Sequence, residues 1–171
     1  MLSEELPAAI YAMLPCLSKD PSENFVAGAS FGGFTAYKLA LDHPEKFAAA
    51  GAFGGAFDVV SILSGTSVEG SDFIPEEPKL AFGTAEDVKG TVNDLFFLAE
   101  KCKKNNTVPK LWSVAGEQDF GIKSIKGALA KFKEIGLEIE EHFTQGGHDF
   151  DTWDSYVEQF LDWLPLKGGR R

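Results

Sequence analysis

Short apolar runs alternate with amphipathic stretches along most of the chain, and this alternation predicts an α/β fold. Strands are predicted at 24–29, 47–53, 110–115 and 139–144. Helices are predicted at 3–14, 32–42, 88–103, 124–135 and 152–164. Strands that alternate with helices favour a mainly parallel sheet with helices on both faces.

Residues from about 55 to 107 are less regular than the rest. We interpret them as an insert or lid within a single domain that spans residues 1–171. Phe57, Phe73 and Phe96 lie in this segment. Their phenyl groups could line an acyl or aryl pocket, or they could belong to ordinary core and lid packing.

Composition and charge narrow the function classes. The chain has 171 residues, 44% of them hydrophobic and 25% charged, and a formal net charge of −10. Such an acidic chain offers no electrostatic surface for nucleic acid and is repelled by anionic membranes, so a small neutral substrate is expected. No apolar run is long enough to cross a membrane.

The two cysteines, Cys16 and Cys102, are far apart and follow no metal-binding or disulfide pattern. We expect reduced thiols in a cytoplasmic protein, with no metal and no cofactor. Residues 1–7 lack the basic and apolar regions of a signal peptide.

The candidate chemistry begins with the pentapeptide Gly28-Ala29-Ser30-Phe31-Gly32. It follows a predicted strand and opens a predicted helix, which is the context of a nucleophile elbow. The small residues around Ser30 allow the tight turn, and Gly32 and Gly33 are expected to allow close approach of helix and strand. The alternative is a glycine-rich turn with a surface serine.

A serine nucleophile needs a base, and the chain has three histidines. His43 ends the helix that starts at the elbow, about 16 Å from Ser30 at ~1.5 Å per residue, which is too far. His142 lies within a strand and is expected to be a packed or solvent-facing residue. His148 lies in the loop after the last strand, where sites of parallel sheets assemble, and is the predicted base.

The base needs an acid that fixes its tautomer. Asp119 follows the third strand and is the predicted acid, with Glu117 as the runner-up. Aspartates near His148 are more typical of loops and helix caps, and Asp151 is a plausible N-cap. The order Ser30, Asp119, His148 is that of α/β-hydrolases, and the backbone N–H of Phe31 is the expected oxyanion donor.

Several segments resemble the esterase D-like family of α/β-hydrolases, which includes tributyrin, acetyl and feruloyl esterases and S-formylglutathione hydrolases. The segments are FVAGASFGGFTAYKLALDHPEKF at 25–47, GGAFD at 54–58, GEQDF at 116–120, GGHDFDTWD at 146–154, FLDWL at 160–164 and EELP at 4–7. The resemblance implies the same roles for Ser30, Asp119, His148 and Phe31.

The resemblance also implies that the first strands of the family fold, with the second oxyanion donor, have no counterpart here. The chain looks like the C-terminal portion of such an enzyme. The strand before Ser30 would then be an exposed apolar edge, so we expect another copy of the chain to cover it as a homo-oligomer.

Three functions follow from these observations. The first is a serine carboxylesterase that hydrolyses short-chain acyl, acetyl or feruloyl esters through an acyl-enzyme. The second is a weakly active or inactive hydrolase fragment that serves as an oligomerisation or binding module. The third is an S-formylglutathione thioesterase.

Overall fold

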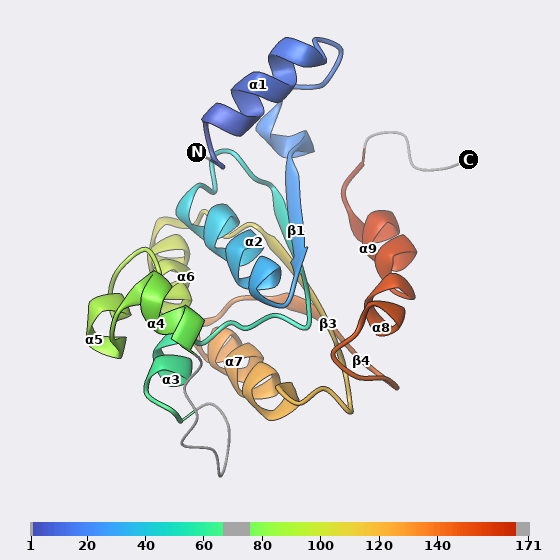
Figure 1. Cartoon of the computed structure of the whole chain (residues 1–171). Helices are drawn as coiled ribbons and strands as arrows, with labels where there is room; N and C mark the ends of the chain where they lie inside the picture. The colour runs from blue at the N-terminus through green and yellow to red at the C-terminus, as the bar shows by residue number, and fades with distance from the viewer. Residues whose placement is uncertain (1, 67–75, 167–171) are drawn as a thin grey trace.

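The computed structural model describes residues 2–66 and 76–166 and contains one four-stranded sheet in the order β1-β2-β3-β4 (Figure 1). The strands are β1 (Phe25–Ala29), β2 (Ala49–Phe53), β3 (Lys110–Gly116) and β4 (Ile139–Thr144). All neighbouring strands are parallel. The predicted α/β class with a parallel sheet is confirmed.

The register aligns the carboxyl ends of the strands. Ala29 pairs with Phe53, Phe53 with Val114, and Val114 with His142. The loops that follow the four strands therefore emerge at one edge of the sheet, which is where parallel sheets place their sites.

One face of the sheet carries the larger core. Here α2 (Phe31–Asp42), α6 (Leu95–Asn105) and α7 (Ile122–Ile135) cover the strands. Tyr37 and Phe132 are fully buried in this core. The Tyr37 hydroxyl donates to the carbonyl of Trp112 at 3.2 Å, so burial of the phenol leaves it hydrogen-bonded while raising its pKa.

The other face carries a smaller core under α8 (Phe150–Asp154) and α9 (Val157–Trp163). Phe160 packs against Phe53 and Trp112, with ring centroids 5.7 and 5.2 Å away. Gly51 makes this possible, because a Cβ there would lie 2.4 Å from the Phe160 ring.

The prediction of a single helix at 152–164 is wrong, because this segment forms two helices, α8 and α9. The Ser155 hydroxyl donates to the carbonyl of Thr152 at 2.7 Å, and the N–H of Tyr156 donates to the carbonyl of Trp153 at 3.0 Å. These short-range bonds end α8 before α9 begins at Val157. The cap of α8 is Asp149, not Asp151.

Between β2 and α6 lie α3 (Val59–Leu63), α4 (Glu76–Phe82) and α5 (Ala85–Val88). The helix predicted at 88–103 begins later, at Leu95, because Asp94 caps α6 by accepting from the N–H groups of Phe96 and Phe97. That this region forms an insert or lid in a single domain stays a prediction.

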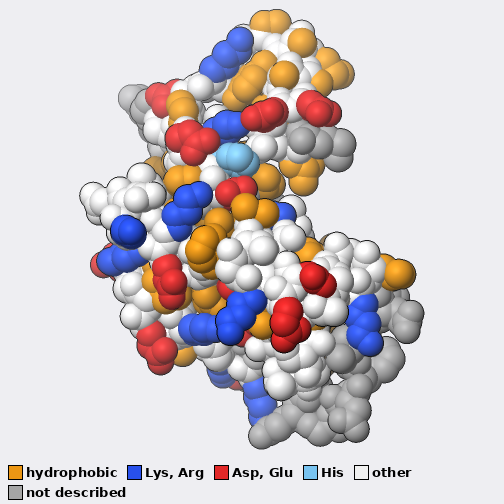
Figure 2. Space-filling model, turned by 90° about the vertical axis from the view of Figure 1, so that its left-hand side faces the viewer, with side chains coloured by type: hydrophobic (Ala, Val, Ile, Leu, Met, Phe, Trp, Pro, Cys, Tyr) orange, Lys and Arg blue, Asp and Glu red, His pale blue; other side chains and the backbone are white. Residues whose placement is uncertain are grey.

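The amino end of β1 leads back through a 3-10 turn, η1 (Pro21–Glu23), to α1 (Glu5–Met13). No residue of α1 is buried, and Leu6, Ile10 and Met13 are exposed. Figure 2 shows hydrophobic side chains gathered at this end of the molecule. A groove of about 900 Å³ runs between α1, β1 and α2.

In the part of the chain that the structure describes, β1 pairs with β2 alone and forms an edge of the sheet. The expected second copy along this edge stays a prediction. No helix in the described ranges is both long and apolar enough to span a bilayer.

Candidate active site

Ser30 sits on a strained turn between β1 and α2. Its φ is 54° and its ψ is −122°, a backbone conformation that residues other than glycine rarely adopt. The Ser30 N–H donates to the carbonyl of Phe53 at 2.8 Å, and its carbonyl accepts from the N–H of Gly33 at 2.9 Å. The neighbouring strand and the first turn of the helix thus hold the serine in this conformation.

Two glycines make the turn sterically possible. A Cβ at Gly28 would lie 2.3 Å from the carbonyl oxygen of Gly32, and one at Gly33 would lie 3.0 Å from the Cβ of Ala52. A Cβ at Gly32 would meet nothing within 4 Å. The expectation that both glycines allow close approach of helix and strand is right for Gly33. It is wrong for Gly32, where a side chain would fit, because the backbone of Gly32 is what lies close to Gly28.

The structure brings Ser30, His148 and Asp119 together in one hydrogen-bonded chain. His148 Nε2 lies 2.9 Å from Ser30 Oγ, and His148 Nδ1 lies 2.7 Å from Asp119 Oδ2. The Asp119 side chain is wholly buried, and its other oxygen accepts from the N–H of Gly121 at 2.7 Å. With Nδ1–H donated to the carboxylate, Nε2 is left to accept the serine proton.

Gly54 and Trp153 support this arrangement, and sequence reasoning did not assign either to the site. A Cβ at Gly54 would lie 3.2 Å from both Asp119 Oδ2 and His148 Nδ1, and 3.0 Å from Trp153 Nε1. The Trp153 ring packs edge-to-face on the imidazole with centroids 4.9 Å apart. The glycine pair directly after the second strand was the available signal for this close approach.

The loop that carries Asp119 and the loop that carries His148 are joined by hydrogen bonds. The Gln118 N–H donates to the carbonyl of Gly146 at 2.9 Å, and the Gly146 N–H donates to Gln118 Oε1 at 2.7 Å. A Cβ at Gly116 would lie 2.1 Å from the carbonyl oxygen of Gly146. These contacts fix the acid and the base relative to each other.

The alternative acids have other partners. Glu117 forms an ion pair with Lys126 at 2.7 Å, away from the imidazole. Asp149 accepts from the N–H of Thr152 at 2.8 Å, and this hydrogen bond holds the pKa of its carboxyl below the usual range. Asp151 and Asp154 make no described hydrogen bond to His148 through their side chains.

The other two histidines lie outside the site. His43 ends α2, with its ring nitrogens 3.7 Å from Asp42 and 3.5 Å from Glu45. His142 packs between Trp112 and Tyr156, at ring-centroid distances of 5.3 and 5.6 Å. His43 as a helix-end residue and His142 as a packed strand residue agree with their expected positions.

Phe31 is the first residue of α2. The N–H group at such a position has no acceptor within its helix and lies at the positive end of the helix dipole. An N–H at a helix N-terminus can donate to a developing negative oxygen, and the oxyanion role of Phe31 stays a prediction. Among the described residues, no group of three or more His, Cys, Asp or Glu side chains is arranged to hold a metal ion.

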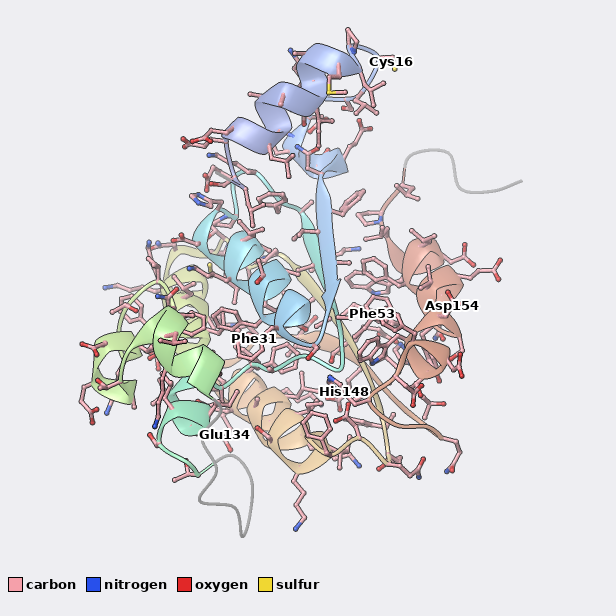
Figure 3. The ribbon with its side chains drawn as sticks, viewed as in Figure 1. Cys16, Phe31, Phe53, Glu134, His148 and Asp154 are labelled. Atoms are coloured by element: carbon pink, nitrogen blue, oxygen red, sulfur yellow. The ribbon has the colours of Figure 1, made fainter. Side chains whose placement is uncertain are left out.

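Of the two alternatives for the phenyl groups of the insert, core packing holds for Phe57 and Phe96, and the expected pocket lining is wrong for both. Phe57 and Phe96 are 2% and 6% exposed and pack against Phe132 in the core. Phe73 lies outside the described residues. Phe31 instead has its ring on the surface at the nucleophile, and it lies at the same end of the sheet as His148 (Figure 3).

Comparisons with known proteins place this geometry in a wider group. Residues 1–164 match the model of the Esterase family, described as "Putative esterase". An acetyl esterase from Caldicellulosiruptor saccharolyticus is 24% identical over 153 residues, which are 83% of this chain and 54% of the relative.

Two solved structures from Staphylococcus aureus have the same fold. The fluorophosphonate-binding serine hydrolase FphF is 27% identical with a TM-score of 0.79, over 95% of this chain and 62% of FphF. The S-formylglutathione hydrolase FrmB is 26% identical with a TM-score of 0.78, over 94% of this chain and 61% of FrmB. The chain thus spans between 54% and 62% of the length of these three relatives.

Proposed function

The chain belongs to the Esterase family, and from that premise we propose that it hydrolyses carboxylic esters with Ser30 as the nucleophile. The observation that carries this proposal is the continuous hydrogen-bonded chain from Asp119 through His148 to Ser30, with steps of 2.7 and 2.9 Å. The strained backbone of Ser30 supports it, because strain of this kind is retained where function requires a particular side-chain direction.

In the proposed reaction, Ser30 Oγ attacks the ester carbonyl while His148 Nε2 takes the hydroxyl proton. The Asp119 carboxylate stabilises the imidazolium that forms, and the Phe31 N–H donates to the oxyanion of the tetrahedral intermediate. His148 then gives its proton to the leaving alcohol, and an acyl-serine remains. A water molecule attacks that ester by the same steps and releases the acid.

The substrate in this proposal is a small neutral ester with a short acyl, acetyl or feruloyl group. The net charge of −10 supports a neutral substrate over an anionic one, because an anion would be repelled. The similarity to an acetyl esterase supports an oxygen ester. Hydrolysis of S-formylglutathione is the second candidate, and the likeness to FrmB favours it. A cytoplasmic location stays a prediction.

Labelling with a fluorophosphonate probe tests the nucleophile. We expect a mass-spectrometric adduct on Ser30 in the folded protein, and no adduct or hydrolysis of p-nitrophenyl acetate in Ser30→Ala. Ser22→Ala is the matched control, since Ser22 is an exposed serine of η1 and should label like the wild type. A folded wild-type protein that does not label would support the binding-module alternative instead.

A further inference from the structure

The exposed phenylalanines of the described residues are concentrated at the proposed active site. Four of the described phenylalanines are exposed, and three of these four lie within two residues of Ser30, Asp119 or His148. They are Phe31 (38% exposed), Phe120 (79%) and Phe150 (79%). The fourth, Phe97, belongs to α6. Large apolar rings gathered in one exposed area are typical of a binding surface.

The Phe31 ring is held by neighbours. It stacks on Phe82 of α4 with centroids 6.3 Å apart and meets Phe34 at 6.1 Å. Phe34 and Phe82 also pack edge-to-face at 5.6 Å. Three mutually packed rings form a wall with a fixed position directly after the nucleophile, so the wall can bind a substrate group with little loss of side-chain entropy.

The Phe120 ring packs on His148, the predicted base. Its centroid is 4.7 Å from that of the His148 imidazole. Trp153 also contacts this imidazole, with ring centroids 4.9 Å apart, and Phe150 packs on Trp153 at 5.1 Å. Phe120 is thus in contact with the base while most of its own surface remains exposed.

The two rings are assigned to different parts of an ester by the roles of their neighbours in the proposed reaction. The Phe31 N–H is the proposed donor to the carbonyl oxygen, so the ring of this residue is assigned to the acyl side of the ester. In the proposed reaction His148 gives its proton to the oxygen of the leaving alcohol, so the Phe120 ring that packs on His148 is assigned to the alcohol side.

We propose that Phe31, supported by Phe82, binds an apolar acyl group and that Phe120 binds an apolar alcohol group. This inference rests on the proposed serine hydrolase function and narrows its substrate class to neutral esters that are apolar on both sides of the scissile bond. Each methylene group of the acyl or alcohol part that is buried on binding should raise kcat/KM by up to about fourfold.

The test measures two substrate series on the wild type, Phe31→Ala and Phe120→Ala. The acyl series is p-nitrophenyl acetate, butyrate and hexanoate, and the alcohol series is methyl, butyl and benzyl butyrate. We expect Phe31→Ala to lower the hexanoate-to-acetate ratio of kcat/KM about tenfold, from a few lost methylene contacts. Phe120→Ala should lower the benzyl-to-methyl ratio by a similar factor and leave the acyl ratio unchanged.

Phe97→Ala is the matched control, because it removes an exposed phenyl ring of α6 and should change neither ratio. Phe31→Leu keeps an apolar side chain and should retain most of the acyl ratio. A uniform loss on all substrates in Phe120→Ala would mean that the ring positions His148 and would overturn its assignment to the alcohol. Ratios that match the wild type in both alanine variants would overturn the proposal.

Failure of the underlying function has a different signature. If Ser30 of the folded protein takes no fluorophosphonate adduct, the serine hydrolase and this inference both fall. If Ser30 is labelled but the ratios do not change, only this inference falls. Where turnover is slow, the rates at which Ser30 is labelled by the p-nitrophenyl esters of ethylphosphonate and hexylphosphonate give the same comparison. In these probes the alkyl group on phosphorus takes the place of the acyl chain.

Discussion

The two ends of β1 are built very differently. At its carboxyl end the strand runs into Ser30, where the backbone, the glycines and the hydrogen bonds of four neighbouring segments leave little freedom. At its amino end it runs back to α1, which has no buried residue and leaves Ile10 and Met13 exposed. One end is fixed by many contacts, and the other is attached by few.

The difference has a physical reason. A serine at φ 54° is strained by roughly 1–3 kcal/mol and keeps that conformation only where the surroundings hold it. Among the described residues, the α1 end has no residue other than glycine with a positive φ. Its described attachments are polar, such as the bond from the Tyr11 hydroxyl to Asn24 Oδ1 at 3.1 Å and the ion pair of Lys46 with Glu4 at 3.3 Å. The Lys46–Glu4 pair is exposed, and exposed ion pairs contribute little to stability.

The largest expected effect is at the acid. Asp119→Asn should lower kcat about 10⁴-fold, because an amide in place of the carboxylate favours the wrong tautomer of His148. Turnover of p-nitrophenyl acetate measures it, with thermal melting to show that the protein is folded. Asp151→Asn is the control, since that exposed aspartate should leave kcat unchanged. A loss of less than tenfold in Asp119→Asn would remove Asp119 from the proposed role.

Gly54→Ala tests how closely the site is packed. The new Cβ would lie 3.2 Å from Asp119 Oδ2 and from His148 Nδ1, so we expect about a 10²-fold loss of kcat from misplacement of the base. Backbone strain at φ +60° should also cost about 1–2 kcal/mol of unfolding free energy.

Gly90→Ala separates the two effects of Gly54→Ala. Gly90 has a φ of +73°, but its Cβ would meet nothing within 4 Å. It should lose stability by a similar amount and keep full activity, as chemical denaturation and turnover would show. Equal turnover in the two variants would mean that contact with the acid and the base is not what matters at Gly54.

A smaller effect is expected at the cap of α8, the helix that carries Trp153. Asp149→Ala should lower the melting temperature at pH 7, while Asp149→Asn should retain most of it, because asparagine also caps helices. The Thr152 N–H lowers the pKa of Asp149. The stabilisation is therefore present above the usual aspartate pKa of about 3.9 and is lost as the pH falls through the lowered value. A difference in melting temperature between the wild type and Asp149→Ala that is the same at pH 7 and at pH 2 would contradict this.

The smallest effect on folding is expected at α1. Ile10→Ser should change the free energy of unfolding of the monomer by less than about 0.5 kcal/mol, as is usual for surface substitutions. Leu129→Ala, at a position 2% exposed in the larger core, should cost about 2–5 kcal/mol. Urea denaturation compares the two. A large loss in Ile10→Ser would mean that the α1 end is as firmly packed as the site.

The same variant tests the predicted second copy along β1, because Ile10 lines the groove beside that strand. Sedimentation of the wild type should show a concentration-dependent dimer, and Ile10→Ser should weaken it. A wild-type protein that stays monomeric at every concentration would contradict the prediction.

The sequence by itself determined the strands, the main helices and the three positions Ser30, Asp119 and His148. It could do so because apolar runs and helical spacing report local burial, and because parallel strands bring the loops at their carboxyl ends to one edge. The order of three polar residues, each in the segment after a different strand, was therefore enough to predict that they would lie close together.

Only the tertiary structure decided which side chains surround those three residues. Phe57 and Phe96 are buried in the core, whereas Phe31 and Phe120 are exposed at the site. The irregular stretch around Phe57 has no periodicity from which a side-chain direction follows. The need for glycine at Gly54 is likewise set by atoms of residues 119, 148 and 153, which are distant in sequence and become neighbours only when the loops meet.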